Sequence, residues 1–225
     1  MSVITIARQY GAGGSSVARI VADRLGADLV DKWLIAEVAR RAELAPSVVE
    51  AEDERPVSLL ARMVDSLGPV AAGAGMVWIP PYPDPAYDPR RVLVEITRRI
   101  LLEVARSGNA VIVGRGASVV LRGPRDATHV FLYADDEIRE QTVMAREIVS
   151  ASVARRRMHQ MDANRAAYLR QVFGVDWRDP LQYALLLNTG ALGNAGTAEV
   201  ILATAQRRAR AASGSGLDPE LQSVP

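Results

Sequence analysis

The sequence predicts an α/β domain in which a mostly parallel sheet is covered by helices on both faces. Short apolar runs rich in β-branched residues alternate along the chain with longer segments of helical periodicity, and this alternation is typical of such a sheet. The runs are largely apolar rather than alternately polar, as expected of strands buried on both faces. A glycine-rich segment directly follows the first run and completes a strand–loop–helix unit.

The N-terminal part of the chain predicts two strands and the helix between them. Val3–Ala7 is the first strand, and Ser15–Leu25 places four apolar side chains on one face of a helix. Gly26 stands where helices commonly end in a left-handed residue. Ala27–Asp31 is the next short strand.

The middle of the chain changes character twice. Residues 32–66 predict mostly helix, whereas 68–90 are rich in Gly, Pro and aromatic residues and predict an irregular excursion. This excursion is a candidate lid or substrate-specificity insert, or alternatively a packed Ω-loop. Arg91–Arg106 returns to helical periodicity and ends at Ser107-Gly108.

The C-terminal part predicts three further strands. Ala110–Val113 and His129–Tyr133 are short apolar runs, and Leu185–Leu187 is the last strand. Asp135–Tyr168 predicts one long helix rich in Arg, and Thr197–Ala212 predicts the last helix.

We expect one domain over residues 1–212, followed by a disordered tail at 213–225. Apolar residues make up 49% and charged residues 24% of the chain, which is ordinary for a globular domain. The net charge of +1 gives no reason to expect nucleic acid or an anionic membrane as partner. The oligomeric state stays open between monomer and homodimer.

The cysteine and lysine contents limit the kinds of binding site that the chain can form. Cysteine is absent, which excludes disulfides and thiolate sites. Lys32 is the only lysine, so an anion site must use guanidinium groups, whose planar forks hold phosphate at two oxygens. The chain opens directly into an apolar run without the plan of a signal peptide, and no apolar stretch has membrane-spanning length. We therefore expect a cytoplasmic protein.

The glycine-rich loop after the first strand is the strongest candidate site. Its backbone N–H groups can converge on an anion at the start of the following helix, and Ser15 or Ser16 can offer a hydroxyl to Mg²⁺. The standard phosphate-loop pattern G-x-x-x-x-G-K-[ST] is not satisfied, because Gly14 stands at the lysine position and Arg8 at the first glycine. The alternative is a turn that only connects strand to helix. The predicted nucleotide-binding residues are Gly11, Ala12, Gly13, Gly14, Ser15 and Ser16.

Further motifs follow in order along the chain. Asp31 closes the second strand and precedes Lys32-Trp33-Leu34-Ile35, and Gly114-Arg115-Gly116 directly follows the third. The remaining motifs are Asp162-Ala163-Asn164-Arg165-Ala166-Ala167-Tyr168, Trp177, Asp179-Pro180, Tyr183 and Leu187-Asn188-Thr189.

Together with the opening ARQYGAGGSS, these motifs resemble the cytidylate-kinase-like family, from about residue 3 to about residue 203. The resemblance implies a P-loop three-layer sandwich with a helical lid and acceptor insert, and a lid-like segment at about 150–180. It also implies that the glycine loop holds a nucleoside triphosphate, that Arg165 lies in a mobile lid and reaches the phosphates, and that Arg115 contacts a monophosphate acceptor. Cytidylate kinase proper has Lys, Asp and Asp where this chain has Gly14, Gly116 and Tyr133, so cytidine specificity is not predicted.

From these patterns we assign roles to individual residues, with ATP and Mg²⁺ as cofactors. Asp31 orients Mg²⁺ water or the acceptor, or alternatively caps the next helix. For the run Arg155–Arg157 we favour a solvated charged face. His129 and the tryptophans Trp33, Trp78 and Trp177 are interpreted as structural. The assigned catalytic residues are Arg8, Arg165 and Asp31, the acceptor-binding residues are Arg115, Asp162 and Arg170, and the metal-binding residues are Ser15 and Ser16.

The sequence thus predicts an ATP-dependent phosphotransferase acting on a nucleoside monophosphate or a similar small molecule. Two alternatives remain. One is a non-catalytic nucleotide-binding or regulatory protein, and the other is a kinase for a non-nucleotide metabolite.

Overall fold

A computed structural model describes residues 2–31, 37–38, 40–41, 89–123 and 127–212. The predicted helix at 32–66, the excursion at 68–90 and the tail at 213–225 fall almost wholly outside the described residues, as do Trp33 and Trp78.

The centre of the molecule is a five-stranded parallel sheet, which confirms the predicted fold class. In spatial order the strands are β2 (Asp28–Val30), β3 (Ala110–Val113), β1 (Val3–Arg8), β4 (Ala127–Tyr133) and β5 (Leu185–Asn188). Every pairing is parallel. The first strand in sequence is therefore the central strand of the sheet.

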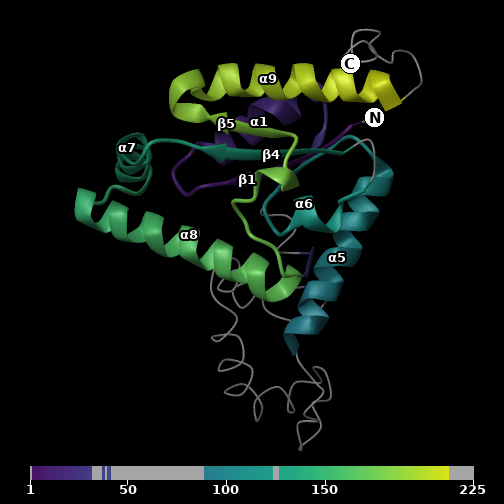
Figure 1. Ribbon diagram of the computed structural model, residues 1–225, viewed down its shortest axis with the longest axis horizontal. Helices are drawn as coiled ribbons and strands as arrows, with labels where there is room; N and C mark the ends of the chain where they lie inside the picture. Colours follow the sequence, from purple (N-terminus) through teal and green to yellow (C-terminus); the bar gives the residue numbers. More distant parts are fainter. Residues whose placement is uncertain (1, 32–36, 39, 42–88, 124–126, 213–225) are drawn as a thin grey trace, which may run out of the picture.

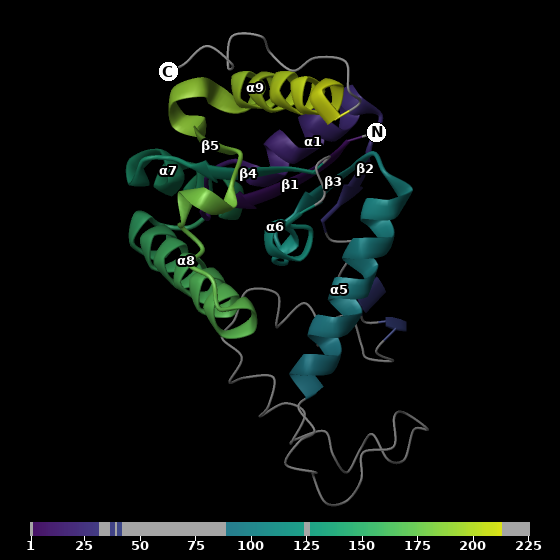
Figure 2. The same cartoon turned by 45° about the vertical axis from the view of Figure 1, so that its right-hand side comes forward.

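Helices cover both faces of this sheet (Figures 1 and 2). On one face lie α1 (Gly14–Leu25) and α9 (Thr189–Ala212), which pack against each other. On the other lie α5 (Pro89–Ser107), the short α6 (Ala117–Val120) and α8 (Ala151–Phe173). The arrangement is the three-layer sandwich that the sequence predicts.

The remaining helices lie at the margins of the layers. Helix α7 (Asp136–Glu147) follows β4 and packs on α8 (Figure 1). A single 3₁₀ turn, η1 (Pro180–Gln182), precedes β5. No helix within the described parts of the chain is long and apolar enough to cross a membrane.

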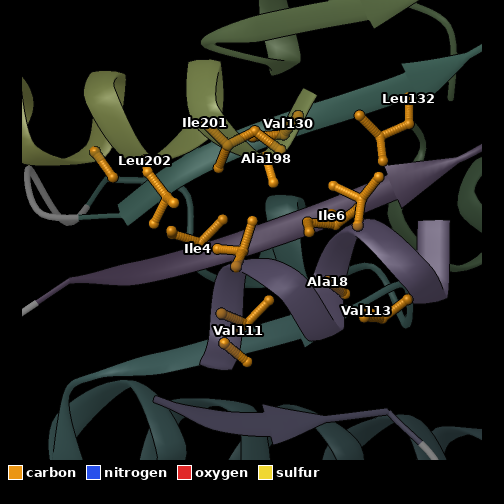
Figure 3. Packing of buried hydrophobic residues seen from close by; sticks show 14 residues of the cluster. Ile4, Ile6, Ala18, Val111, Val113, Val130, Leu132, Ala198, Ile201 and Leu202 are labelled. Carbon is orange, nitrogen blue, oxygen red and sulfur yellow. The ribbon is translucent and has the colours of Figure 1, made fainter. Parts of the chain in front are cut away.

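The alternating side chains of β1 reach two separate cores. Ile4 and Ile6 are fully buried against α1 and α9 (Figure 3), whereas Val3 and Ala7 belong to clusters on the opposite face. Each fully buried Ile contributes roughly 1.5–3 kcal/mol of transfer free energy. Burial on both faces explains why the strands read as apolar runs.

The prediction of one continuous helix over Asp135–Tyr168 is wrong. Ile148 adopts a left-handed conformation with φ 53°, which a β-branched residue rarely does. The extended Ser150 then starts α8, in the position where Ser is a favoured cap. The Arg-rich segment is therefore two helices, α7 and α8.

Helix α9 also begins earlier than the predicted Thr197. Asn188 ends β5, and its side-chain oxygen accepts hydrogen bonds from the backbone N–H of Gly190 (2.9 Å) and Ala191 (3.3 Å). Such capping satisfies N–H groups that the first turn leaves without a partner. Gly193, with φ 66° and ψ 167°, interrupts the helix before it continues to Ala212.

Candidate functional site

The carboxyl ends of β1 and β3 meet at the edge where such sheets bind ligands. Arg8 ends β1, and Gly114 follows β3 and donates its N–H to the Ile6 carbonyl at 3.0 Å. A pocket opens at this edge, between the sheet, α6 and α8. It is lined by Thr5, Ile6, Ala7, Arg8, Gly114, Arg115, Gly116, Ser118, Arg165, Tyr168, Leu169 and Trp177.

The glycine loop lies next to this pocket, between β1 and α1. Gly11 and Gly13 have φ of 84° and 69°, values that favour glycine. A Cβ atom on Gly11 would also lie 2.8 Å from the carbonyl oxygen of Arg139 in α7. Gly13 is the N-cap of α1 and has no side-chain cap. Both glycines are therefore required by the local backbone and its neighbours.

A buried ion pair holds the loop in place through Tyr10. The Tyr10 N–H donates to Asp162 Oδ1 at 2.8 Å, and the Tyr10 carbonyl accepts from Arg139 Nε at 2.9 Å. Arg139 and Asp162 also join each other at 2.5 Å, with side chains only 5% and 8% exposed. Buried charges need such partners, since water no longer solvates them. We name Tyr10, Arg139 and Asp162 the loop clasp.

Arg139 is a site residue that no motif in the sequence indicates. It lies in the Arg-rich segment, where spacing alone does not separate a buried arginine from exposed ones. Asp162 was assigned to acceptor binding, and the structure places its two carboxylate oxygens on Tyr10 and Arg139. The signal that would have found the pair is an acidic residue on α8 facing a basic residue on α7, and that becomes visible only once the helix break at Ile148 is known.

The Tyr10 side chain extends the contacts of the loop to the surface. Its hydroxyl donates to Glu147 Oε1 at 2.5 Å, and the guanidinium of Arg146 lies 4.7 Å from the centre of its ring. Burial raises the pKa of Glu147, but hydrogen bonds from Arg146, Tyr10 and Arg157 outweigh it and lower that pKa to about 2.

Ser15 and Asp31 come together at the start of α1. The Ser15 hydroxyl lies 3.4 Å from Asp31 Oδ2, and Ser15 and Ser16 are both exposed in the first turn. A hydroxyl beside a carboxylate offers the oxygen ligands that Mg²⁺ prefers, with substrate phosphates and waters completing its shell. No cluster of three or more His, Cys, Asp or Glu residues is found within the described residues. The pair fits a metal held largely by the nucleotide.

Three arginines from three elements line the pocket together. Arg8 comes from β1, Arg115 from the turn after β3 and Arg165 from α8. Arg165 is 11% exposed, and its Nη1 donates to the Arg8 carbonyl at 2.9 Å. The same nitrogen lies 3.8 Å from Asp162 Oδ1, so the loop clasp also orients Arg165.

The turn that carries Arg115 has an unusual backbone. Gly114, Arg115 and Gly116 all have positive φ, of 75°, 59° and 68°. A non-glycine residue held in this region costs of order 1 kcal/mol or more, and such strain is found at binding sites more often than elsewhere. A Cβ on Gly116 would overlap the Phe173 ring and lie 3.3 Å from Leu169 Cδ2. The close approach of α8 thus leaves no room for a larger residue there.

Other candidate residues lie away from this pocket. Arg170 is exposed and is not a lining residue. Arg155 pairs with Glu140 at 3.1 Å and Arg157 with Glu147, with side chains 61% and 48% exposed. These are contacts of a solvated face.

Of two residues interpreted as structural, Trp177 is buried and His129 is half-buried. Trp177 is 2% exposed, and its ring meets that of Phe131 edge-on at 5.3 Å, although one side of it reaches the pocket. His129 Nδ1 lies 2.8 Å from the Thr5 hydroxyl. Burial, together with the charges of Arg208 and Arg122, lowers the pKa of His129 to about 4. At neutral pH the ring is therefore uncharged.

Comparison with known proteins adds to this picture. The model of the cytidylate kinase-like family matches residues 3–191. A cytidylate kinase from Methanopyrus kandleri is 33% identical over 104 residues, which are 43% of this chain and 53% of that protein. The match therefore spans about half the length of this curated relative.

Solved structures resemble the chain over most of its length. An uncharacterized protein from Eubacterium ventriosum aligns with a TM-score of 0.66 at 20% identity, over 92% of this chain and 99% of its own. A gluconokinase from Sinorhizobium meliloti aligns with a TM-score of 0.49 at 16% identity, over 96% and 98% of the two chains. At 20% identity, the similarity to the Eubacterium ventriosum protein shows a shared fold and nothing about function.

Proposed function

The chain belongs to the cytidylate kinase-like family, and from this we propose that it transfers the γ-phosphoryl group of ATP to a nucleoside monophosphate or a similar phosphorylated small molecule. The observation that carries the proposal is the pocket beside the glycine loop. Three guanidinium groups line it, and no acidic side chain does so among the described residues. Such a pocket suits a multiply charged anion better than a neutral substrate.

In this proposal the glycine loop binds the triphosphate. The N–H groups at the start of α1 face the phosphates, and no side chain caps them. Ser15 and Asp31 would hold Mg²⁺, directly or through water, and the metal would neutralise charge on the phosphate oxygens. The loop clasp keeps Tyr10 in position and so fixes the loop before any nucleotide binds.

The arginines would act on the transferred group and on the acceptor. An oxygen of the acceptor's phosphate forms a bond to the γ-phosphorus as the bond from that phosphorus to the β,γ-bridging oxygen breaks. ADP leaves with the electron pair, and a proton on the acceptor's phosphate is released to solvent. Phosphoryl transfer needs mainly alignment and cations around the oxygens that gain charge. We assign the acceptor's phosphate to Arg115 and the transferred group to Arg8 and Arg165.

The position of Arg165 favours a catalytic function over simple nucleotide storage. Binding ATP requires the glycine loop, but it does not require a buried guanidinium on the far side of the pocket. Arg165 is held there by the Arg8 carbonyl and by the neighbouring Asp162. Preorganised charge of this kind lowers barriers because it needs no rearrangement during the reaction.

A turnover screen tests the proposal. Purified protein is incubated with ATP and Mg²⁺ and with each nucleoside monophosphate, each matching nucleoside and a panel of unphosphorylated metabolites, and ADP is measured. We expect ADP formation with one or more of the monophosphates and none with the matching nucleosides. ATP binding without turnover on any acceptor would favour a regulatory protein, and turnover confined to unphosphorylated metabolites would favour a metabolite kinase.

A further inference from the structure

The glycine loop departs from the standard phosphate-binding pattern at two positions. In G-x-x-x-x-G-K-[ST] the lysine reaches the β- and γ-phosphates from the first turn of the helix. Here Gly14 stands at the lysine position, and Arg8 stands where the pattern has its first glycine. A small residue and a cation have thus exchanged places.

The structure shows that the two departures are in contact. A Cβ atom on Gly14 would lie 2.6 Å from Cγ of Arg8 and 3.1 Å from its Cβ. At the other end of the same side chain, a Cβ on Gly114 would overlap Nη1 of Arg8. The Arg8 side chain therefore runs from the start of α1 to the turn after β3.

The backbone of Gly14 does not itself require glycine. Gly11, Gly13 and Gly114 have positive φ, but Gly14 does not and is the first residue of α1. Glycine within a helix costs about 1 kcal/mol relative to alanine. The observation that accounts for glycine at this position is the stem of Arg8, which fills the space that a side chain would need.

We infer that Arg8 takes over the phosphate-binding task of the missing lysine, and that Gly14 is glycine because the stem of the Arg8 side chain lies over it. The inference rests on the proposed function and names the cation that the function needs. A guanidinium can hold two phosphate oxygens at once, whereas an ammonium is a point charge. Arg8 lines the pocket with Arg115 and Arg165. Its stem lies beside the start of α1, and its guanidinium lies beside Gly114, in the turn that carries Arg115.

The exchange has a steric consequence that a mutant cycle can measure. A lysine at position 14 must displace the Arg8 stem, since its own Cβ would lie 2.6 Å from Cγ of Arg8. We expect Arg8→Gly and Gly14→Lys each to lower kcat about 100-fold and to weaken ATP binding about tenfold or more. The double variant restores the standard pattern and should return kcat to within about tenfold of the wild type. Such recovery is strong coupling between the two positions.

Two further variants separate charge from packing. Arg8→Met keeps most of the stem without the guanidinium, and we expect it to lose as much kcat as Arg8→Gly. Gly14→Ala keeps the guanidinium but displaces the stem, so kcat should fall about tenfold or more. The matched control is Gly196→Ala in α9, where an added Cβ meets only Leu192 Cβ at 3.8 Å, and it should behave as the wild type. Thermal unfolding of every variant identifies any that fail to fold.

Nucleotide affinity, measured by calorimetry with ATP and Mg²⁺ and no acceptor, makes the test independent of turnover. If the wild type binds ATP but transfers to no acceptor, the proposed function fails. The inference about Arg8 is then tested by the ATP affinities of the wild type, the two single variants and the double variant. If the wild type turns over and Arg8→Met keeps wild-type kcat and affinity, the inference is overturned while the proposed function stands. The inference is also overturned if the double variant loses as much ATP affinity and kcat as the two single variants lose together.

Discussion

Arg157 and Arg165 lie about two turns apart on α8, yet their side chains meet different surroundings. Arg157 is 48% exposed and pairs with Glu147 on the solvated side of α7. Arg165 is 11% exposed, donates to the Arg8 carbonyl and lines the pocket. The N-terminal half of the helix carries more arginine, but the α8 residues that line the pocket, Arg165, Tyr168 and Leu169, all lie in its C-terminal half. Position relative to the pocket, rather than charge density, distinguishes the pocket-lining arginine from the surface one.

The largest expected effect concerns the loop clasp, whose Asp162 lies at the middle of α8. Asp162→Ala leaves Arg139 buried without its carboxylate, and removing one partner of a buried pair costs about 3–5 kcal/mol. The free energy of unfolding from urea titrations measures this loss. The matched change is Glu140→Ala in α7, which removes the partner of Arg155 in the N-terminal half of α8 and should cost less than about 1 kcal/mol. Equal losses in the two variants would remove the distinction between the buried pair and the solvated one.

The next largest effect is on catalysis. Arg165→Ala should lower kcat and kcat/KM together by about 10²–10³, because the lost charge acts mainly on the transition state. Arg157→Ala, with the same change of charge on the same helix, should stay within about twofold of the wild type. Both are assayed on the acceptor that the turnover screen identifies. If Arg165→Ala folds and keeps near-normal kcat, Arg165 has no catalytic role, as we expect for Arg157.

A smaller effect is expected at the acceptor side of the pocket. Arg115→Lys keeps the charge but loses the planar fork, so the KM for the acceptor should rise about tenfold while ATP affinity changes little. Lysine and arginine should carry a similar strain energy at this left-handed position, so we expect the change to have little effect on folding. Steady-state kinetics with each substrate varied separately provide the measurement. A loss confined to ATP affinity would move Arg115 from the acceptor to the nucleotide.

The smallest effect is the pH dependence of stability that arises from Glu147, the partner of Arg157 at the end of α7. The pKa of Glu147 is lowered to about 2 in the folded protein, so its contribution to stability is present above its ordinary pKa of about 4.5 and is lost as the pH falls from 4.5 towards 2. The difference in unfolding free energy between wild type and Glu147→Gln should be below about 1 kcal/mol at pH 6, because Arg146 and Arg157, the charged partners of Glu147, are 51% and 48% exposed and solvent screens their charges. It should shrink by more than half at pH 3. A difference that stays constant between these two pH values contradicts the assignment.

Local patterns in the sequence predict the sheet and the glycine loop because each depends on residues close together in the chain. Val3–Ala7 is buried on both faces and is therefore an apolar run in the sequence. Gly11 and Gly13 then provide the positive φ angles of the following loop. Arg8 ends one strand and Arg115 lies just after another, and the carboxyl ends of parallel strands meet at one edge of the sheet. Their approach to one pocket is a consequence of strand order.

What the sequence did not predict depends on contacts between distant segments. The break at Ile148 contradicts local helical periodicity, and it is compatible with the packing of α7 on α8. Arg139 is buried by partners on the glycine loop and on α8, far from it in sequence. At Gly116, which also has positive φ, a Cβ would overlap the Phe173 ring, a contact that no local pattern contains.

The most direct test of the central claim follows the phosphoryl group itself. ATP labelled at the γ-phosphate is incubated with the protein, Mg²⁺ and each nucleoside monophosphate, and the labelled products are separated. We expect the label to appear in a nucleoside diphosphate, and the transfer to fall by at least about 100-fold in Arg165→Ala but not in Arg157→Ala. Label that remains in ATP with every monophosphate, or that moves only to unphosphorylated acceptors, would contradict the claim that the three-arginine pocket receives a phosphorylated acceptor.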